Sequence, residues 1–378
     1  MVNFSCETKE LKRILSAASK IAVLKASLPI LSNVFLNAYE NKLELWATDL
    51  EIGIKLYISA NVEKNFQTTV SAKLLYDIVN NLDEKILNFV QKESNILEIN
   101  GENFKYQLNT LPVEDYPTLP TDIEEKPIVL NQKIFKDSLQ ETLFAAAGAN
   151  EDNVVLSGVL FKIENNKLNM VALDGYRLAK KSFEIESGNL SNEIIIPAKA
   201  LSEVSKLLNN TDDKVEIFYD KFKAVIKANN FVLFSRLLEH QFPQYERVFP
   251  KEINIRLIVN KEKLSKALKR ICLISIAKES PNLIKLNLKN EKFYISANTQ
   301  DVGNGYEEVE FEDLDSKTNE DFFISFNAKY LLDVLTILEC KDVRLEFSNY
   351  SSPGIITKSL SDDFVSVIMP VRTLGTLP

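Results

Sequence analysis

The sequence predicts an α+β fold of three repeated modules, each with about two helices and an antiparallel sheet. The first observation is a strand-turn-strand pattern that returns three times and ends at Ala47, Ala172 and Ala297, 125 residues apart. The second is that each copy lies between two segments with helical periodicity. A repeat of this length indicates copies of a whole domain rather than a solenoid, and three such domains fit a chain of 378 residues.

The repeated strand pairs occupy residues 34–47, 160–172 and 284–297. In each pair, apolar residues alternate with polar ones on both sides of a turn that contains Asn and Lys, which is typical of a β-hairpin. Further alternating segments predict strands at residues 52–60, 86–91, 104–111, 215–220 and 343–348. Their short connections favour antiparallel pairing, because parallel strands require crossover helices.

Helical periodicity precedes and follows each strand pair. The preceding helices are predicted at residues 6–21, 130–146 and 259–275, and the following helices at residues 70–82, 196–208 and 326–338. Apolar residues recur at helical spacing, as at Leu74, Ile78 and Leu82. Ser71 and Asn327 are suitable N-cap residues for two of the following helices.

Proline and charged residues cluster at residues 121–127 and 250–254, where we place the linkers. The predicted domains are therefore residues 1–126, 127–253 and 254–378. Each of them is of ordinary domain size, and a hydrophobic content of 45% lets each fill a core of its own.

The composition also limits where the protein resides. The longest apolar runs are short and interrupted, so we expect no membrane span. The first ten residues carry charge where a signal peptide needs an apolar stretch, and we expect a cytoplasmic protein. A net charge of −8 taken alone speaks against a nucleic-acid partner, provided that the charge is evenly spread.

The sequence offers few groups for catalysis or for a metal. Cys6, Cys272 and Cys340 have no CxxC spacing and His240 is the only histidine, so we predict buried thiols, no metal site and no catalytic residue. No P-loop or GxGxxG motif is present, and we expect no cofactor. Because carboxylates are abundant, composition alone leaves a magnesium-dependent nuclease open.

The predicted helices are rich in lysine, whereas acidic residues dominate elsewhere. One lysine recurs at an equivalent place in the three copies, as Lys73, Lys199 and Lys329. The simplest interpretation is that these lysines lie on solvated helix faces. If all the helices lined one surface, however, that surface could be positive while the whole chain stays acidic. Such a surface would contact phosphates and carry no sequence information.

Seven short motifs occur in order along the chain, among them ALDGYRLAK and VIMPVR. They lie at residues 27–36, 47–54, 109–117, 172–180, 241–250, 327–335 and 367–372 and span nearly the whole length. Together they resemble the beta sliding clamp family of bacterial DNA polymerase III. The resemblance implies the DNA clamp fold, with two chains joined head to tail in a closed ring of six domains, helices inside and sheets outside.

The resemblance further implies a non-catalytic processivity factor that encircles double-stranded DNA without reading its sequence. Following the family, the candidates for DNA contact are Arg13, Lys25, Lys73, Asn150, Lys199 and Lys206. The homodimer interface is expected to join Lys105, Tyr106 and Leu108 of one chain to Ile274, Asp301 and Glu307 of the other.

The family also implies a pocket between the second and third modules, where DNA polymerase subunits, the clamp loader and repair proteins insert short linear peptides. Its expected wall is largely apolar with a few hydrogen-bonding groups. The wall residues are Leu156, Leu173, Gly175, Tyr176, Arg177, Leu178, Pro243, Arg247, Val248, Asn327, Tyr330, Val367, Ile368, Met369, Pro370, Val371 and Arg372.

Two departures from the family pattern concern this pocket. Tyr176 stands where the family commonly has His, and Leu173 stands where it has a small Thr. The chain also continues past Arg372 through residues 373–378, and our hypothesis is that Leu374 or Leu377 covers part of the pocket. The alternative functions are a peptide-binding scaffold that forms no ring and a metal-dependent DNA-processing enzyme.

Overall fold

The structure is a computed structural model that describes residues 2–23, 28–93, 95–148, 153–185, 192–275, 282–299, 302–317 and 321–372. The chain forms two compact units. Unit 1 comprises Met1–Lys136 and Lys199–Leu237, and unit 2 comprises Asp137–Ala198 and Leu238–Pro378. The second repeat therefore contributes to both units, whereas the first lies in unit 1 and the third in unit 2.

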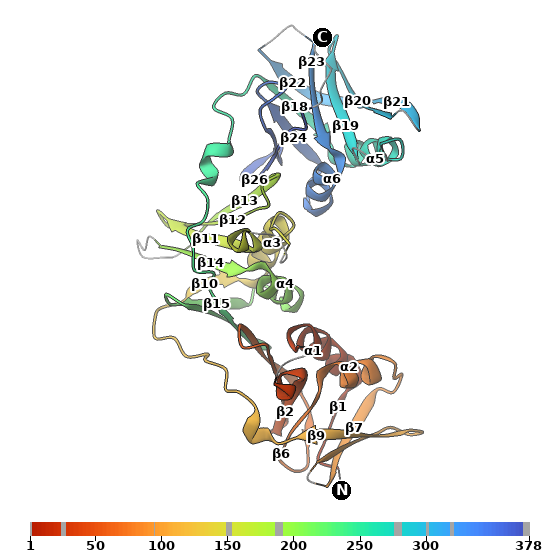
Figure 1. Cartoon of the computed structure of the whole chain (residues 1–378), viewed down its shortest axis with the longest axis vertical. Helices are drawn as coiled ribbons and strands as arrows, with labels where there is room; N and C mark the ends of the chain where they lie inside the picture. The colour runs from red at the N-terminus through yellow and green to blue at the C-terminus, as the bar shows by residue number, and fades with distance from the viewer. Residues whose placement is uncertain are drawn as a thin grey trace. The chain divides into compact units, whose positions relative to one another are not determined.

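Unit 1 is built on one sheet with two helices packed on the strands of the first repeat. Its strands form a 13-stranded sheet in the order β10-β15-β16-β17-β4-β3-β2-β6-β9-β8-β7-β1-β5. Helices α1 and α2 contact each other and pack on β2, β3, β4 and β6 (Figure 1). The elements are β1 (Phe4–Glu7), α1 (Thr8–Ile21), β2 (Asn33–Tyr39), β3 (Lys42–Thr48), β4 (Ile52–Ser59), β5 (Asn61–Val62), β6 (Phe66–Ser71), α2 (Ala72–Asn80), β7 (Ile86–Glu93), β8 (Ile96–Asn100), β9 (Lys105–Leu111), β10 (Ile128–Asn131), β15 (Lys214–Tyr219), β16 (Lys223–Ala228) and β17 (Phe231–Arg236).

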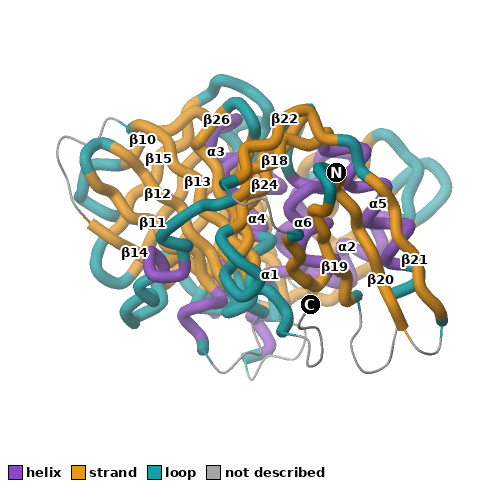
Figure 2. The backbone as a smooth tube through the Cα atoms, turned by 90° about the horizontal axis from the view of Figure 1, so that it is seen from above, coloured by secondary structure: helices purple, strands orange, loops and turns teal. Residues whose placement is uncertain are grey.

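Unit 2 holds two antiparallel sheets, of nine strands in the order β14-β11-β12-β13-β26-β25-β24-β18-β22 and of four in the order β21-β20-β19-β23. Strands β19, β20 and β21 run side by side in Figure 2. The elements are β11 (Gly158–Glu164), β12 (Lys167–Leu173), β13 (Arg177–Glu184), β14 (Asn192–Pro197), β18 (Ile255–Asn260), α5 (Lys261–Cys272), β19 (Leu283–Lys289), β20 (Lys292–Thr299), β21 (Gly303–Glu308), β22 (Phe311–Ser316), β23 (Phe322–Asn327), α6 (Ala328–Ile337), β24 (Asp342–Phe347), β25 (Gly354–Lys358) and β26 (Ser361–Ile368). The boundary between the units falls within α3 (Gln132–Leu143) and at the start of α4 (Ala198–Leu207).

The three repeated hairpins, β2-β3, β11-β12 and β19-β20, share one turn geometry. Each has a two-residue turn, at residues 40–41, 165–166 and 290–291. All six of these residues have positive φ, between 45° and 61°. A turn with positive φ at both positions matches the right-handed twist of the flanking strands, and Asn tolerates this conformation better than most residues. The predicted repeat of strand, polar turn and strand is therefore confirmed.

All six predicted helices are present, with small corrections to their ends and faces. The first begins at Thr8 rather than at residue 6, because residues 4–7 form β1. Ser71 and Asn327 cap α2 and α6, and each accepts a hydrogen bond from a backbone N–H. The buried face of α2 differs in part from the predicted one: Ala72, Leu75 and Val79 are buried, whereas Leu74 is 47% exposed. Leu82, which follows the helix, is buried. Of the three thiols predicted to be buried, Cys6 is buried, whereas Cys272 and Cys340 are partly exposed.

Strands from different repeats pair directly at two places. In unit 1, β4 of the first repeat pairs with β17 of the second, and in unit 2, β13 of the second repeat pairs with β26 of the third. Strands β4 and β13 directly follow the repeated hairpin in their own copies. The second pairing is supported by Ser366, which is fully buried and donates a hydrogen bond from its hydroxyl to the Leu178 carbonyl at 2.9 Å.

A buried network of charged groups holds the joint between β13 and β26. Glu141 of α3 contacts the ammonium groups of Lys181 on β13 and Lys358 on β25, each at 2.7 Å. Lys181 also pairs with Asp363 of β26. Lys181 and Glu141 are 7% and 5% exposed, so neither can recover its hydration if the other is removed. The network therefore joins four elements from two repeats: α3, β13, β25 and β26.

We expect Glu141→Gln to lower the free energy of unfolding by about 3 kcal/mol or more, because it leaves two ammonium groups in a buried site with one carboxylate. Urea denaturation followed by circular dichroism measures this change. The matched control is Glu262→Gln, which breaks an exposed pair with Lys266 on α5 and should cost less than about 0.5 kcal/mol. Equal effects of the two substitutions would contradict the role of the buried network.

Candidate functional site

The turn between β12 and β13 is shaped by its own side chains. The Asp174 carboxylate accepts hydrogen bonds from the backbone N–H groups of Tyr176 and Arg177, both at 2.9 Å. Gly175 has φ +88°, a region that residues with a Cβ rarely adopt. An Asp followed by Gly thus encodes this turn locally. The turn presents Tyr176 to solvent, where its side chain is 63% exposed.

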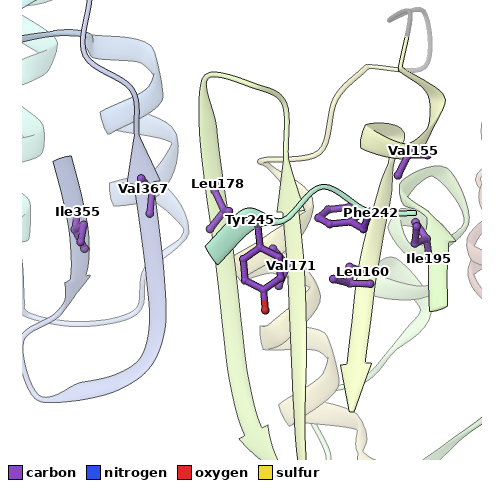
Figure 3. Packing of buried hydrophobic residues seen from close by; sticks show 9 residues of the cluster. All are labelled: Val155, Leu160, Val171, Leu178, Ile195, Phe242, Tyr245, Ile355 and Val367. Atoms are coloured by element: carbon purple, nitrogen blue, oxygen red, sulfur yellow. The ribbon is translucent and has the colours of Figure 1, made fainter. Parts of the chain in front are cut away.

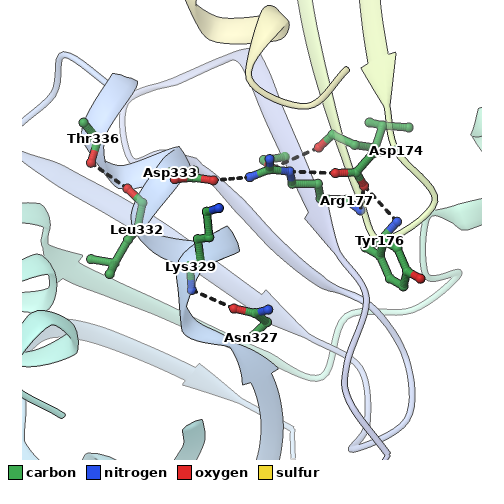
Figure 4. A network of polar contacts seen from close by, with 10 residues as sticks. Asp174, Tyr176, Arg177, Asn327, Lys329, Leu332, Asp333 and Thr336 are labelled. Carbon is green, nitrogen blue, oxygen red and sulfur yellow. Dashed lines mark hydrogen bonds and ion pairs between the residues drawn. The ribbon is translucent and has the colours of Figure 1, made fainter. Parts of the chain in front are cut away.

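Arg177 connects this turn to helix α6. Its Nε donates to Asp174 at 3.0 Å, and its guanidinium also pairs with Asp333 of α6 (Figure 4). The guanidinium lies over the ring of Tyr330 at 4.8 Å and over that of Phe144 at 5.3 Å. The side chain is 11% exposed, so these contacts are shielded from bulk water. Arg177 is therefore a fixed part of the surface rather than a free cation.

Tyr176 and the last described residues of the chain contact the same region as Arg177. The rings of Tyr176 and Tyr330 are stacked, with centroids 6.2 Å apart and planes at 20°. The backbone N–H of Met369 donates to the Tyr176 carbonyl, and the N–H of Val371 donates to the Ser325 carbonyl, both at 2.8 Å. Strands of the second and third repeats and residues 369–371 therefore meet at one surface.

Below this surface lies a cluster of buried apolar residues. It includes Leu178 of β13 and Val367 of β26, with Phe242 and Tyr245 from the segment that crosses the strands (Figure 3). Leu173 and Val248 are partly buried and pack against it. The cluster spans the joint between the repeats, so the surface above it rests on a continuous core.

The structure brings the described members of the predicted pocket wall together in unit 2, but at different depths. Leu178, Val367 and Ile368 are 2%, 1% and 1% exposed and belong to the core, so a bound peptide would not reach them without rearrangement. The partly exposed members are Leu156, Leu173, Arg177, Val248, Asn327, Tyr330 and Pro370. The exposed members are Gly175, Tyr176, Pro243, Arg247, Met369, Val371 and Arg372. We call these fourteen partly exposed and exposed residues the candidate peptide site.

Sequence reasoning did not identify four residues that shape this site: Phe144, Asp174, Ser325 and Asp333. Asp174 was open to prediction, because it precedes Gly175 in a turn. Asp333 was not, since it lies 156 residues from Arg177 and carries no local signal. The side chain of Asn327 accepts a hydrogen bond from the Lys329 N–H, so its present role is that of a helix cap. Residues 373–378, with Leu374 and Leu377, lie outside the described residues.

The described candidates for DNA contact all form surface ion pairs. The pairs are Arg13 with Glu10 at 3.1 Å, Lys73 with Asp77 at 3.1 Å, Lys199 with Asp49 at 2.7 Å and Lys206 with Glu203 at 2.7 Å. The four cationic side chains are 37% to 60% exposed. Glu10 and Asp77 are exposed too, so their pairs add little stability, whereas Asp49 and Glu203 are 15% and 8% exposed. The predicted segregation of charge is therefore incomplete, because carboxylates lie among the lysines. Lys25 and Asn150 fall outside the described residues.

The predicted dimer residues lie on two strand regions, one in each unit. Lys105, Tyr106 and Leu108 belong to β9, where Tyr106 is 40% exposed and Leu108 is 6% exposed. Glu307 belongs to β21 and pairs with Arg270, and Ile274 follows α5. Asp301 lies outside the described residues.

Lys105 already has a partner within its own chain. Its ammonium lies 2.8 Å from Glu98, whose side chain is 3% exposed. This hydrogen bond, with others from Asn100 and Gln107, lowers the pKa of Glu98 to about 2. An ion pair from Lys105 to another chain would therefore compete with Glu98.

Within the described ranges of the chain, no group of three or more His, Cys, Asp or Glu residues is arranged to hold a metal ion. No helix in the same ranges is both long and apolar enough to cross a bilayer.

Comparison with known proteins identifies the family. Three domain families of the DNA polymerase III beta subunit match in order: the N-terminal domain at residues 2–120, the central domain at 129–244 and the C-terminal domain at 246–372. The beta sliding clamp of Staphylococcus epidermidis is 29% identical, over 92% of this chain and 93% of the relative.

Solved structures agree. The DNA polymerase sliding clamp of Bacillus subtilis superposes with a TM-score of 0.88 at 27% identity, covering 98% of this chain and 99% of the other. The DNA polymerase III beta subunit of Pseudomonas aeruginosa gives 0.86 at 28% identity, covering 98% and 100%. With its mixed helix and sheet composition and three matched domains in order, the chain belongs to the DNA polymerase III beta subunit family, whose members are non-catalytic sliding clamps.

Proposed function

We propose that this chain forms a head-to-tail homodimer that closes around double-stranded DNA and tethers DNA polymerase subunits, the clamp loader and repair proteins in the cytoplasm. The tethered proteins would bind through short peptides at the candidate peptide site. No catalytic step, cofactor or membrane partner is part of the proposal. The proposal of a closed ring is supported by the way in which equivalent strands of the three repeats pair.

Strands β4, β13 and β21 each follow the repeated hairpin of their own copy. Strand β4 pairs with β17 and β13 pairs with β26, each across a boundary between repeats. Among the described residues, β21 pairs only with β20, and residues 105–108 of β9 pair only with β8. If β21 of one chain pairs with β9 of another, the third joint repeats the first two and the open edges are covered.

The exposed helix cations, each with a carboxylate nearby, suit a ring that slides. A closed ring stays on DNA without strong binding, and tight phosphate contacts would resist movement. Lys73 pairs with the exposed Asp77 at little gain in stability, so it can exchange that partner for a passing phosphate. Lys199 and Lys206 pair with Asp49 and Glu203, which are 15% and 8% exposed, so a phosphate would have to share their ammonium groups with these carboxylates.

We expect the candidate peptide site to bind short peptides with moderate affinity. Two buried Leu or Phe anchors of a peptide would supply roughly 3–6 kcal/mol, whereas a micromolar complex requires about 8 kcal/mol. Backbone hydrogen bonds would supply the remainder. Several partners could then compete for the site and exchange on it, with Met369 providing an adaptable contact.

We expect the protein, once loaded, to remain on nicked circular DNA and to be lost when a restriction enzyme linearises that DNA, because only topology retains it. Gel filtration of labelled protein with DNA before and after cutting measures the retention. Tyr106→Asp should reduce both dimer formation and retention by about tenfold, because it places a charge at the proposed interface. The matched control is Phe222→Asp, at a 60% exposed aromatic residue in unit 1 away from β9.

Equal retention on linear and circular DNA would contradict the ring. Metal-dependent cleavage of the DNA would instead support the enzyme alternative. If charge reversal at Lys73, Lys199 and Lys206 leaves retention and polymerase stimulation unchanged, the DNA contacts assigned to these residues are wrong.

For the peptide site, we expect Tyr330→Ala to weaken binding of a hexapeptide with Leu and Phe anchors by about tenfold or more. The substitution removes the ring on which Tyr176 stacks and over which Arg177 lies. Isothermal titration calorimetry measures the affinity. Phe222→Ala serves as the control and should leave it unchanged, and an unaltered affinity in Tyr330→Ala would exclude this surface as the peptide site.

A further inference from the structure

One face of the four-stranded sheet in unit 2 carries a set of aromatic residues. Residues that are direct partners across antiparallel strands lie on the same face, as do alternate residues of one strand. By this rule two neighbouring rows share a face. The rows are Phe323, Asn287, Tyr294 and Glu308, and Ser325, Lys285, Ser296 and Tyr306.

The opposite face of this sheet is the buried one. Leu286, Ile295 and Ile324 form its central row and are at most 2% exposed. Helix α5 packs against β19, β20 and β21, and α6 packs against β23. A Cβ placed on Gly305 would meet the Ile274 side chain at 2.5 Å, so Gly305 faces the α5 side and its neighbour Tyr306 faces away. The aromatic rows therefore lie on the face that these helices do not cover.

The aromatic side chains on the uncovered face are arranged in two pairs. Tyr294 and Tyr306 meet edge to face, with ring centroids 6.0 Å apart. Phe323 stacks with Tyr350, from the loop after β24, at 6.2 Å and 22°. Tyr350 is 63% exposed. Tyr306 is 76% exposed within this chain and lies on β21, the strand proposed to pair with another chain. Such exposure is unusual for rings of this size. We call Lys285, Tyr294, Tyr306, Phe323 and Tyr350 the aromatic sheet face.

Lys285 supplies an unbalanced positive charge at this face. Its ammonium lies 3.8 Å from the centroid of the Phe323 ring, and no carboxylate of the described residues lies within ion-pair distance. Burial lowers the pKa of Lys285, as expected for an ammonium group that has lost water without gaining an anion. The neighbouring lysines are already neutralised, Lys292 by Glu308 at 3.2 Å and Lys289 by Asp321 at 3.0 Å.

This charge pattern favours a protein over a nucleic acid as the occupant. A single strand of DNA would meet one free cation and the carboxylates of Glu308 and Asp321, whereas such strands are bound in grooves that are positive throughout. A peptide with one carboxylate and planar side chains would complement both Lys285 and the rings.

The aromatic sheet face is continuous with the candidate peptide site. The N–H of Val371, a member of that site, bonds to the carbonyl of Ser325 on β23. Phe323 lies two residues from Ser325 along the same strand, a distance of about 7 Å. An extended peptide covers roughly 3.3 Å per residue, so a flank of three to six residues leaving the candidate peptide site reaches Phe323 and Tyr350.

We propose that the aromatic sheet face binds the segment next to the anchoring peptide of a tethered protein, and that this segment is extended, carries a carboxylate and is rich in Tyr, Phe or Pro. The inference rests on the proposed peptide function of the neighbouring site. Binding of the anchor would bring the flank to the face at high effective concentration, so weak contacts there add to affinity.

The test compares three peptide probes by isothermal titration calorimetry. The short probe is the hexapeptide with Leu and Phe anchors, and two long probes add Asp-Tyr-Pro-Tyr to its N-terminus or its C-terminus. We expect one long probe to bind about tenfold tighter than the short one. Tyr350→Ser and Lys285→Ala should abolish this gain and leave the affinity of the short probe unchanged. Lys285→Glu should transfer the preference to a long probe with Lys in place of Asp.

The control variant is Phe222→Ser, which removes an exposed aromatic residue of unit 1 and should keep the gain. A gain below twofold for both long probes, or a gain that survives Tyr350→Ser, overturns the inference while leaving the peptide site intact. If the short probe itself does not bind, the peptide function fails first and the inference with it. Binding of a twenty-residue oligo(dT) that is lost in Tyr350→Ser would overturn the inference by assigning the face to single-stranded DNA.

Discussion

The antiparallel pairing of β13 with β26 is the interaction on which the candidate peptide site depends. It joins a strand of the second repeat to one of the third and places Arg177 opposite Ile368. From that position Arg177 reaches Asp333 on α6 and lies over Tyr330, while the Tyr176 carbonyl holds Met369. The buried network around Glu141 ties the same two strands to α3. If the two strands separated, the residues from the second repeat and those from the third would no longer form one continuous site.

The same joint is used with different chemistry in different places. The pairing of β4 with β17 in unit 1 repeats the geometry of β13 with β26, but Asp49 there pairs with Lys199 rather than with an arginine that stacks on aromatic rings. In the third repeat, β21 is the strand equivalent to β4 and β13. Among the described residues it pairs with β20 and has no partner equivalent to β17 or β26. The equivalent strands of the three repeats thus form an internal joint, a joint beside the candidate peptide site, and an edge that we propose pairs with another chain. Side chains distinguish the first two joints, whereas the third differs because β21 has no second partner strand among the described residues.

Local features were predictable from the sequence, whereas features that join distant residues were not. The three hairpins, the six helices and the caps at Ser71 and Asn327 follow from turn chemistry and periodicity within a few residues. The pocket residues were predicted from the family resemblance. Leu178 and Val367 do not line an open wall as expected, because they belong to the buried core between β13 and β26. Asp333 and the Glu141 network connect residues over 150 positions apart and leave no periodic signal. The ion pairs of the candidates for DNA contact, Arg13, Lys73, Lys199 and Lys206, were not predicted, because charge counts do not show which groups are in contact.

Native-state hydrogen exchange at the paired amides of β13 and β26 tests most directly whether this joint is a permanent part of the fold. The account predicts that the slowest amides among residues 177–181 and 364–368 exchange as slowly as those of the core strand β12, through unfolding of unit 2 as a whole. They should also show the same dependence on denaturant as the β12 amides. Exchange of the joint about a hundredfold faster than that of β12, with little dependence on denaturant, would mean that the repeats separate locally and that the peptide site is not preformed.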